Sequence, residues 1–261
     1  MSPEHGLGTY NGTKVSLTYV GFASLLGVDE EFAANLTSTM SRLMPIRIGS
    51  LGQIQEWAKD YDSNGGTNHL SQLYPLFPGA QIDPRFNVTL VDAAKVSLKQ
   101  RGDSSAGWPT AWRANCFARL LDGEKAYYYM QRLLNLFSYD NLWSINNVFQ
   151  IDANFVRIHL EKLIFCALQG GANAIAEMIL QSHNGEIHIL PAIPASWKEG
   201  SVTGFRARGG FTLDIAWSDR SLVSAKLKST SGTFARVRYD GNAIDLAFDK
   251  GEEKTLTVSD F

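Results

Sequence analysis

The stretch Phe211-Thr212-Leu213-Asp214-Ile215-Ala216-Trp217 alternates large apolar residues with smaller or polar ones. A period of two is typical of a β-strand that buries one face. The alternation recurs at residues 223–227 and 237–239. Turn signals separate these runs, at Ser218-Asp219, Ser231-Gly232 and Asp240-Gly241. Residues 185–261 are therefore predicted to form a small antiparallel β-sandwich, a supporting domain with no motif of its own.

Residues 1–184 have the spacing of helices instead. Segment 29–43 places apolar residues three and four positions apart, which predicts an amphipathic helix. Further helices are predicted over 14–26, 53–61, 89–101, 108–121 and 124–137. Long aromatic loops with prolines join them, an order that suggests helical hairpins closing into a toroid. The predicted fold is thus mainly α with C-terminal β, with domains at 1–184 and 185–261.

Composition excludes several classes of protein. Hydrophobic residues make up 44% of the 261 residues, enough for a packed core, and the net charge is −2. That charge indicates neither a nucleic-acid footprint nor a polybasic membrane patch. No run approaches the ~18 apolar residues of a membrane span. Cys116 and Cys166 make no disulfide framework and no metal motif, and the first residues lack the apolar core of a signal peptide.

One carboxylate stands in an apolar setting, in Phe149-Gln150-Ile151-Asp152-Ala153-Asn154-Phe155. A buried carboxylate must be hydrogen-bonded or paired, or its pKa rises. Gln150 and Asn154 are suited to supply those bonds. The alternative is that Asp152 simply caps a helix beginning at Ala153. A catalytic interpretation needs a second carboxylate elsewhere.

Glu56 is the candidate for that second carboxylate. Trp57 beside it is able to exclude water and so favour a protonated acid, although a single helical Glu is more commonly just exposed. Downstream, His69 and Gln72 lie in a polar, aromatic loop of the kind that binds hydroxyl groups. His69 alone is more commonly a structural histidine. Aromatic residues, 11% of the chain, fill cores but also stack on sugars.

Several motifs occur in a characteristic order. They are Gln53-Ile-Gln-Glu-Trp57, the loop His69-Leu-Ser-Gln-Leu-Tyr74, Gly107-Trp108 with Ala111-Trp112, Ala118-Arg-Leu120, Phe149–Phe155, Ile187–Pro194 and Arg206-Ala-Arg-Gly-Gly-Phe211. Together they resemble the C-terminal part of glycoside hydrolase family 95, the inverting 1,2-α-L-fucosidases. The resemblance implies the last helices of an (α/α)6 toroid followed by the β-sandwich. It covers nearly the whole chain.

The resemblance also implies roles. Glu56 corresponds to the general acid, and Asp152 to the aspartate that takes part in activating water. An inverting glycosidase keeps two such carboxyl groups about 6.5–9.5 Å apart. The substrate-binding candidates are Trp57, His69, Gln72, Trp108, Gln150 and Asn154. The implied substrate is a glycan with terminal α-1,2-linked fucose, without a metal or cofactor, and no nucleic-acid or membrane partner is indicated.

Two departures from the family pattern stand out. Residues 2–6 resemble an internal segment of the family, so we expect Met1 to be an artificial start and the chain to be a C-terminal fragment. Residues 156–169 separate Phe155 from Gly170, where the family continues directly into a Gly-rich helix start. Valine codons begin GT and a glutamine codon can be CAG, so this segment has the ends of a retained intron from a eukaryotic gene. A genuine insertion is the alternative.

We therefore expect a fucosidase-like chain that is weakly active or inactive by itself. The alternatives are a non-catalytic carbohydrate-binding remnant, an α-L-galactosidase of the same family, and a fragment that does not fold. Sequons at Asn11, Asn35 and Asn87 are a weak indication of secretion. An extracellular location is expected for the full-length protein, and the sequence says nothing about its oligomeric state.

Overall fold

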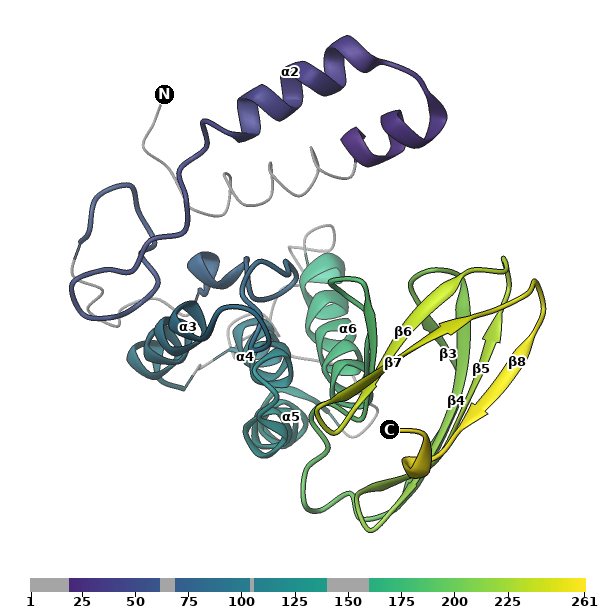
Figure 1. Cartoon of the computed structure of the whole chain (residues 1–261). Coiled ribbons are helices and arrows are strands. Elements are labelled where there is room, and N and C mark those ends of the chain that lie inside the picture. The colour runs from purple at the N-terminus through teal and green to yellow at the C-terminus, as the bar shows by residue number, and fades with distance from the viewer. Residues whose placement is uncertain (1–18, 62–68, 104–105, 140–159) are drawn as a thin grey trace. The chain divides into compact units, whose positions relative to one another are not determined.

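A computed structural model of the chain describes residues 19–61, 69–103, 106–139 and 160–261, with the side chains of its last long helix described from Gly170 onward (Figure 1). The described chain is helical in its first part and carries β-sheets at its C-terminus, as predicted. Clustering of contacts separates two compact units, Met1–Ser104 and Ser105–Phe261. The boundary between residues 184 and 185 stays a prediction from sequence pattern.

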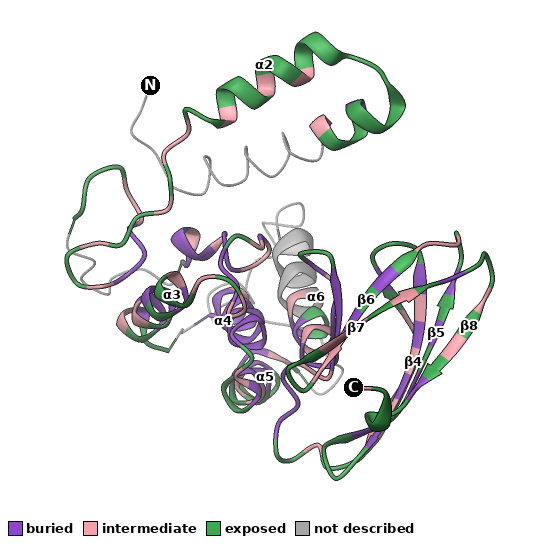
Figure 2. Ribbon diagram, viewed as in Figure 1, coloured by how far each residue is buried: buried purple, intermediate pink, exposed green. Residues whose placement is uncertain are grey.

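The first unit begins with a helical hairpin, composed of helix 19–26 and α2 (Glu30–Met40). Gly27 has φ +64°, the left-handed conformation that ends helices, as its place in the sequence predicts. The two helices meet where Tyr19 and Phe32 pack edge to face. None of the residues of α2 is buried, and Figure 2 shows most of this hairpin exposed. The predicted amphipathic helix therefore forms without burying its apolar face.

The remainder of the first unit consists of a loop-rich region and α3 (Val88–Arg101). The Asn87 side chain accepts a hydrogen bond from Leu90 N at 3.2 Å and so caps the helix N-terminus. Gly102, with φ +57°, ends α3 at the predicted place. The short 3-10 helix η1 (Ser71–Leu73) precedes α3. Its surroundings are tightly packed, since Leu70, Leu73 and Leu76 are fully buried.

The predicted helix over 53–61 is wrong. Ile48 and Ile54 instead form an antiparallel bridge, and Gly49 N donates to Gln53 O at 2.8 Å. A Cβ on Gly49 would lie 2.2 Å from the Gln53 side chain, and Gly52 has φ +79°. Glycines at both points permit a tight turn that the helical propensity of Gln53–Trp57 does not reveal.

The second unit starts with α4 (Gly107–Arg119), α5 (Gly123–Phe137) and α6 (Leu160–Ile179), which lie side by side in Figure 1. Asp122 separates α4 from α5 as predicted, and its side chain caps α5 by accepting from Lys125 N at 3.0 Å. Pro109 occupies the third position of α4, within its first turn. No described helix is long and apolar enough to cross a membrane.

Two four-stranded sheets form the C-terminal sandwich, in the orders β1-β2-β6-β7 and β3-β4-β5-β8. The strands are β1 (Leu180–Gln181), β2 (Glu186–Ile189), β3 (Gly200–Ala207), β4 (Phe211–Ser218), β5 (Ser221–Ser229), β6 (Phe234–Tyr239), β7 (Asn242–Ala247) and β8 (Glu253–Leu256), followed by η3 (Val258–Asp260). The prediction of a purely antiparallel sandwich is wrong at one pair, because β2 and β6 run parallel. A parallel pair needs a long connection, and β3, β4 and β5 all lie between these two strands in the sequence.

The alternating residues of the opening stretch form the centre of the sandwich core. Phe211, Leu213 and Ile215 are at most 1% exposed, and they pack in one cluster with Ile187 of the other sheet. Burying a side chain of this size contributes about 1.5–3 kcal/mol. The turn after β4 is also the predicted one: both of its central residues have positive φ, as two-residue hairpins require.

Candidate functional site

The loop that carries Glu56 is held by one face of α3. Ser97 and Arg101 lie four residues apart and therefore on the same side of the helix. The Ile54 amide donates a hydrogen bond to Ser97 Oγ at 2.9 Å, and Arg101 Nη2 donates to Glu56 Oε2 in an ion pair. The side chains of Arg101 and Glu56 are 4% and 13% exposed. The Glu56 carboxyl group is thus fixed in position, next to a cation.

The other end of the loop is fixed by Asp60. Its carboxylate accepts from Ser50 N at 2.6 Å and from Gln53 Nε2 at 3.1 Å. The hydrogen bond from the Ser50 backbone lowers the pKa of Asp60 below its ordinary value. Gln55 Nε2 donates to the Trp57 carbonyl at 2.6 Å, and Trp57 itself is half-buried. Glu56 is therefore presented by a loop that is tied at both ends.

Gln72 and His69 lie in the second predicted loop, and the structure places them differently. His69 is exposed, whereas Gln72 is 2% exposed and lies among buried leucines. Its Oε1 atom is buried and accepts no hydrogen bond from the described part of the chain. A buried acceptor without a donor is costly, and such groups commonly contact a ligand or water. Gln72 thus has an acceptor without a donor but no direct access from solvent, whereas His69 is accessible.

Trp108 belongs to the second unit, where it lies half-buried near the start of α4 and packs against Trp112, with ring centroids 5.7 Å apart. Asp152, Gln150 and Asn154 lie outside the described residues, as does the possible helix cap at Ala153. Glu56 and Trp108 fall in separate compact units. The catalytic pairing of Glu56 with Asp152 consequently stays a prediction.

A polar ladder between α4 and α6 was missed by sequence reasoning. Asn115 Nδ2 donates to Gly170 O at 2.8 Å, and Asn173 Nδ2 donates to Asn115 Oδ1 at 2.7 Å. Arg119 binds Glu177 through two hydrogen bonds of 2.6 and 2.9 Å. On both helices these residues are four positions apart, which was the signal that could have revealed the ladder.

Close approach of the helices depends on two glycines. A Cβ on Gly170 would lie 3.0 Å from Ala111 Cβ, and one on Gly171 would lie 2.7 Å from Leu133 Cδ2. Both glycines follow directly after segment 156–169, and residues 160–169 continue the same helix toward its N-terminus. The segment is thus helical in its described residues, from Leu160 onward.

Other chemistries have little support among the residues described. Burial raises the pKa of Cys116 to about 12, despite the nearby Arg113 and Arg119, so its thiol is not a nucleophile at neutral pH. The described side chains contain no cluster of three or more His, Cys, Asp or Glu that could hold a metal.

Comparison with known proteins identifies the family of proteins to which the chain belongs. The family model described as "Glycosyl hydrolase family 95 catalytic domain" matches residues 13–158. A second, described as "Glycoside hydrolase family 95, C-terminal domain", matches residues 181–260. The chain belongs to glycoside hydrolase family 95, and the resemblance stated from its motifs is confirmed.

The curated relatives carry fucosidase names. The chain is 33% identical to "Alpha-L-fucosidase 2" of Arabidopsis thaliana, with 92% of this chain and 30% of that protein covered. It is 37% identical to "Probable alpha-fucosidase A" of Aspergillus niger, covering 83% and 29%, and 32% identical to the protein of that name from Aspergillus oryzae, covering 91% and 36%. The chain spans about a third of the length of these relatives.

Proposed function

We propose that this chain carries the two catalytic carboxyl groups of an inverting α-L-fucosidase, which releases terminal α-1,2-linked fucose from glycans. Family membership and the fucosidase names of the relatives support the reaction class. The observation that carries the assignment of Glu56 is its loop, which is tied to α3 by the Ile54–Ser97 hydrogen bond and closed by Asp60. Positioned groups of this kind are what catalysis requires, since small displacements lower the rate steeply.

In the proposed reaction Glu56 gives a proton to the glycosidic oxygen as the bond to the sugar breaks. Asp152 takes a proton from the water that attacks the opposite face of the anomeric carbon, so the configuration inverts. Gln150 and Asn154 hold Asp152 in its ionised form. Trp57, His69, Gln72 and Trp108 bind the sugar. The Oε1 atom of Gln72 has no donor among the described residues, and a sugar hydroxyl would reach it only after the surrounding side chains move apart.

The helices of both units belong, in this proposal, to an (α/α)6 toroid with the active site in its concave face. Segment 156–169 is a retained intron or a late insertion beside Asp152. The close packing of Gly170 and Gly171 supports the view that the family's helix start lies there. Sequencing of transcripts across codon 156 is the test, and reads that all retain the segment would contradict the intron.

We also propose that the 261-residue polypeptide turns over little or no substrate by itself. Glu56 must donate a proton, yet in this structure its carboxyl group forms an ion pair with Arg101. An acid that is engaged by a buried guanidinium has to exchange this partner for the glycosidic oxygen. The segment next to Asp152 adds a second obstacle, because Val156 and Arg157 lack the conformational freedom of glycine.

The experiment is an assay of fucose release from a fucosyl-α-1,2-galactoside by the purified chain, with α-1,3- and α-1,4-fucosides and an α-L-galactoside as alternatives. Three proteins are compared: the wild type, Glu56→Gln, and Glu31→Gln, whose side chain is exposed on α2. We expect no release above background from any of them. Release by the wild type and Glu31→Gln but not Glu56→Gln would contradict the inactivity while supporting Glu56 as the acid.

A carbohydrate-binding remnant is the second candidate, and the Arg101–Glu56 ion pair favours it because a paired carboxylate can still accept hydrogen bonds from hydroxyl groups. Calorimetric binding of L-fucose without turnover, weakened in Gln72→Ala, would distinguish it. An α-L-galactosidase differs by one hydroxymethyl group of the substrate, so preference for the α-L-galactoside would identify that specificity. For the full-length protein we propose an extracellular location.

A further inference from the structure

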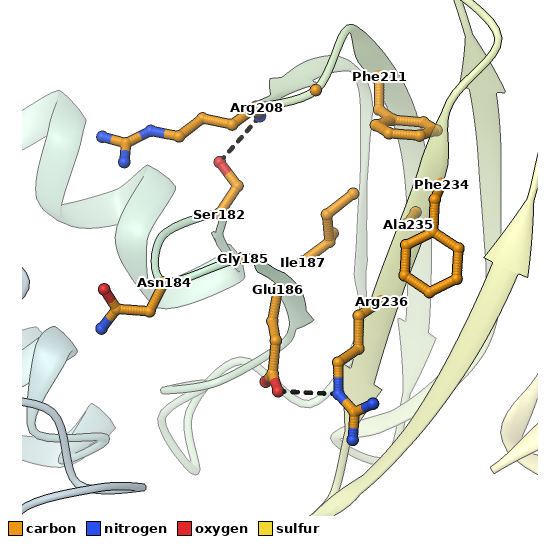
Figure 3. A pocket seen from close by; sticks show the side chains of 11 residues that line it. Ser182, Asn184, Gly185, Glu186, Ile187, Arg208, Phe211, Phe234, Ala235 and Arg236 are labelled. Carbon is orange, nitrogen blue, oxygen red and sulfur yellow. Dashed lines mark hydrogen bonds and ion pairs between the residues drawn. The ribbon is translucent and has the colours of Figure 1, made fainter. Parts of the chain in front are cut away.

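The C-terminal sandwich has a cavity of its own. It has a volume of about 250 Å³ and lies where β2 and β6 begin beside the turn between β3 and β4 (Figure 3). Small-molecule sites usually start at about 300 Å³, so this cavity suits one sugar ring rather than an oligosaccharide. All of its walls come from the second compact unit. It is therefore formed without any residue of the unit that carries Glu56.

The base of the cavity is apolar and one wall is aromatic. Ile187 and Ala235 are each 4% exposed and Phe211 is 1% exposed, so the base is part of the sandwich core. Phe234 lines the same cavity but is 61% exposed. A large ring left open beside a cavity offers an apolar surface on which the C–H face of a sugar can stack.

The charges around the cavity leave one cation unbalanced. Glu186 accepts from Arg236 Nε at 3.1 Å and from Arg238 Nε at 2.7 Å, and Arg236 also binds Asp245 at 3.0 Å. Arg208 forms no ion pair with a carboxylate of the described residues. Figure 3 shows Arg208 and Phe234 on opposite sides of Ile187, with the Arg208 side chain extended away from Phe234. Arg208 is exposed, so rotation of its long side chain would bring the guanidinium group over the cavity. A ligand that spans the cavity would meet a cation on one side and a ring on the other.

The turn that presents Arg208 is held rigidly. Gly209 and Gly210 have φ of +87° and +79°, a conformation that favours glycine. Arg208 N donates to Ser182 Oγ at 3.2 Å, and the Gly209 carbonyl accepts from Thr233 Oγ1 at 3.1 Å. This turn is part of the Arg206–Phe211 motif, for which hydrolysis by Glu56 and Asp152 offers no role.

We propose that this cavity binds a single uronic acid residue of an acidic glycan. The carboxylate pairs with Arg208, the ring stacks on Phe234, and the Ser182 hydroxyl is available to a sugar hydroxyl. A uronate combines what the cavity requires: one negative charge, one apolar face and the size of one ring. Pairing of an arginine fork with a carboxylate is geometrically specific, so a neutral sugar of the same shape binds more weakly.

The test is isothermal titration of the whole chain with D-galacturonic acid, D-galactose and acetate. We expect galacturonate to bind at least about tenfold more tightly than galactose, because a hydrogen bond to a charged group contributes roughly that factor. Arg208→Gln should weaken galacturonate binding by about tenfold on the same basis. Phe234→Ala should weaken it about three- to tenfold through lost ring contact.

Lys250→Gln is the matched control for charge, since Lys250 is exposed and does not line the cavity. It should bind galacturonate as the wild type does. Glu56→Gln should do so too, which separates this proposal from that of hydrolysis. Equal affinity for galactose and galacturonate would overturn the proposal. It would also be overturned if acetate bound as tightly as galacturonate and Phe234→Ala left the affinity unchanged. Absence of galacturonate binding at high millimolar concentration would also overturn it.

Discussion

Two helical regions of this molecule have a similar spacing of apolar residues, but only one of them buries these residues. The hairpin of helix 19–26 and α2 leaves Leu25, Leu26 and Phe32 exposed by 83%, 71% and 53%. In the bundle of α4, α5 and α6, Leu133 and Met130 are at most 4% exposed. Helix formation needs only the local spacing of residues, but burial needs a partner surface. The helices of the bundle supply such a surface to one another, because glycines and the polar ladder let them approach closely. Substitutions in both regions test this difference, and the largest effect is expected at a buried ion pair.

Arg119→Met should be the most damaging of these changes. It leaves the carboxylate of Glu177, 14% exposed, without its buried partner, and breaking a buried pair costs about 3–5 kcal/mol. Hydrogen exchange of the α4 and α6 amides measures the free energy of local opening. Lys95→Met on α3 is the control, since its pair with Asp92 is exposed and contributes about 0–1 kcal/mol. Similar losses from both would mean that burial does not strengthen the ladder.

Leu133→Ala should destabilise the bundle by about 2–5 kcal/mol, because it leaves a cavity between α5 and α6. Leu25→Ala removes the same atoms from the hairpin but should change stability by less than about 0.5 kcal/mol, as exposed sites usually do. Urea unfolding followed by circular dichroism, with hydrogen exchange to separate the two units, compares them. A large loss from Leu25→Ala would show that the hairpin face is covered in solution.

A glycine-to-alanine change should have opposite signs in the two regions. Gly171→Ala should cost about 1–3 kcal/mol, because the new methyl group meets Leu133 Cδ2 at 2.7 Å and overpacks the contact. A Cβ at Gly21 meets nothing within 4 Å, so Gly21→Ala should stabilise its helix by up to about 1 kcal/mol. Thermal unfolding of the two variants is the measurement. Stabilisation by both would contradict close packing at Gly171.

The smallest effect concerns pH and the loop of Glu56. The hydrogen bond from Ser50 lowers the pKa of Asp60, so the folded state favours its ionised form. Stability from this group is present above about pH 4, the ordinary range of Asp, and is lost as the pH falls through the lowered pKa. Asp60→Asn should therefore speed hydrogen exchange of the loop at pH 7 and have a smaller effect near pH 2. An equal effect at both values would contradict this linkage.

Sequence reasoning was most accurate where local chemistry decides the structure. It located α3, the break between α4 and α5, and the hairpin turns of the sandwich, since caps, glycines and alternation act within a few residues. It was wrong at 53–61, where residues with good helical propensity form a tight turn. The hydrogen bonds that hold this loop, one accepted by Ser97 and one donated by Arg101, involve residues more than forty positions away.

In the candidate site, too, local motifs indicated candidate residues, whereas contacts between distant residues were not foreseen. Glu56 and Gln72 could be nominated from motifs, and family membership confirmed the class of protein they belong to. Arg101, which pairs with Glu56, was not foreseen, because no local pattern links the end of a helix to a loop so far upstream. Nor was the parallel pairing of β2 with β6, which depends on where three intervening strands are placed.

The sequence by itself determined the change from helices to strands, the family, and which carboxyl groups are candidates for catalysis. Only the tertiary structure decided which helices bury their faces, what holds the loop of Glu56, and where the sandwich is hollow. The physical reason is one of range. Backbone propensity and capping act between neighbours in the chain, whereas burial and ion pairing depend on residues that folding brings together.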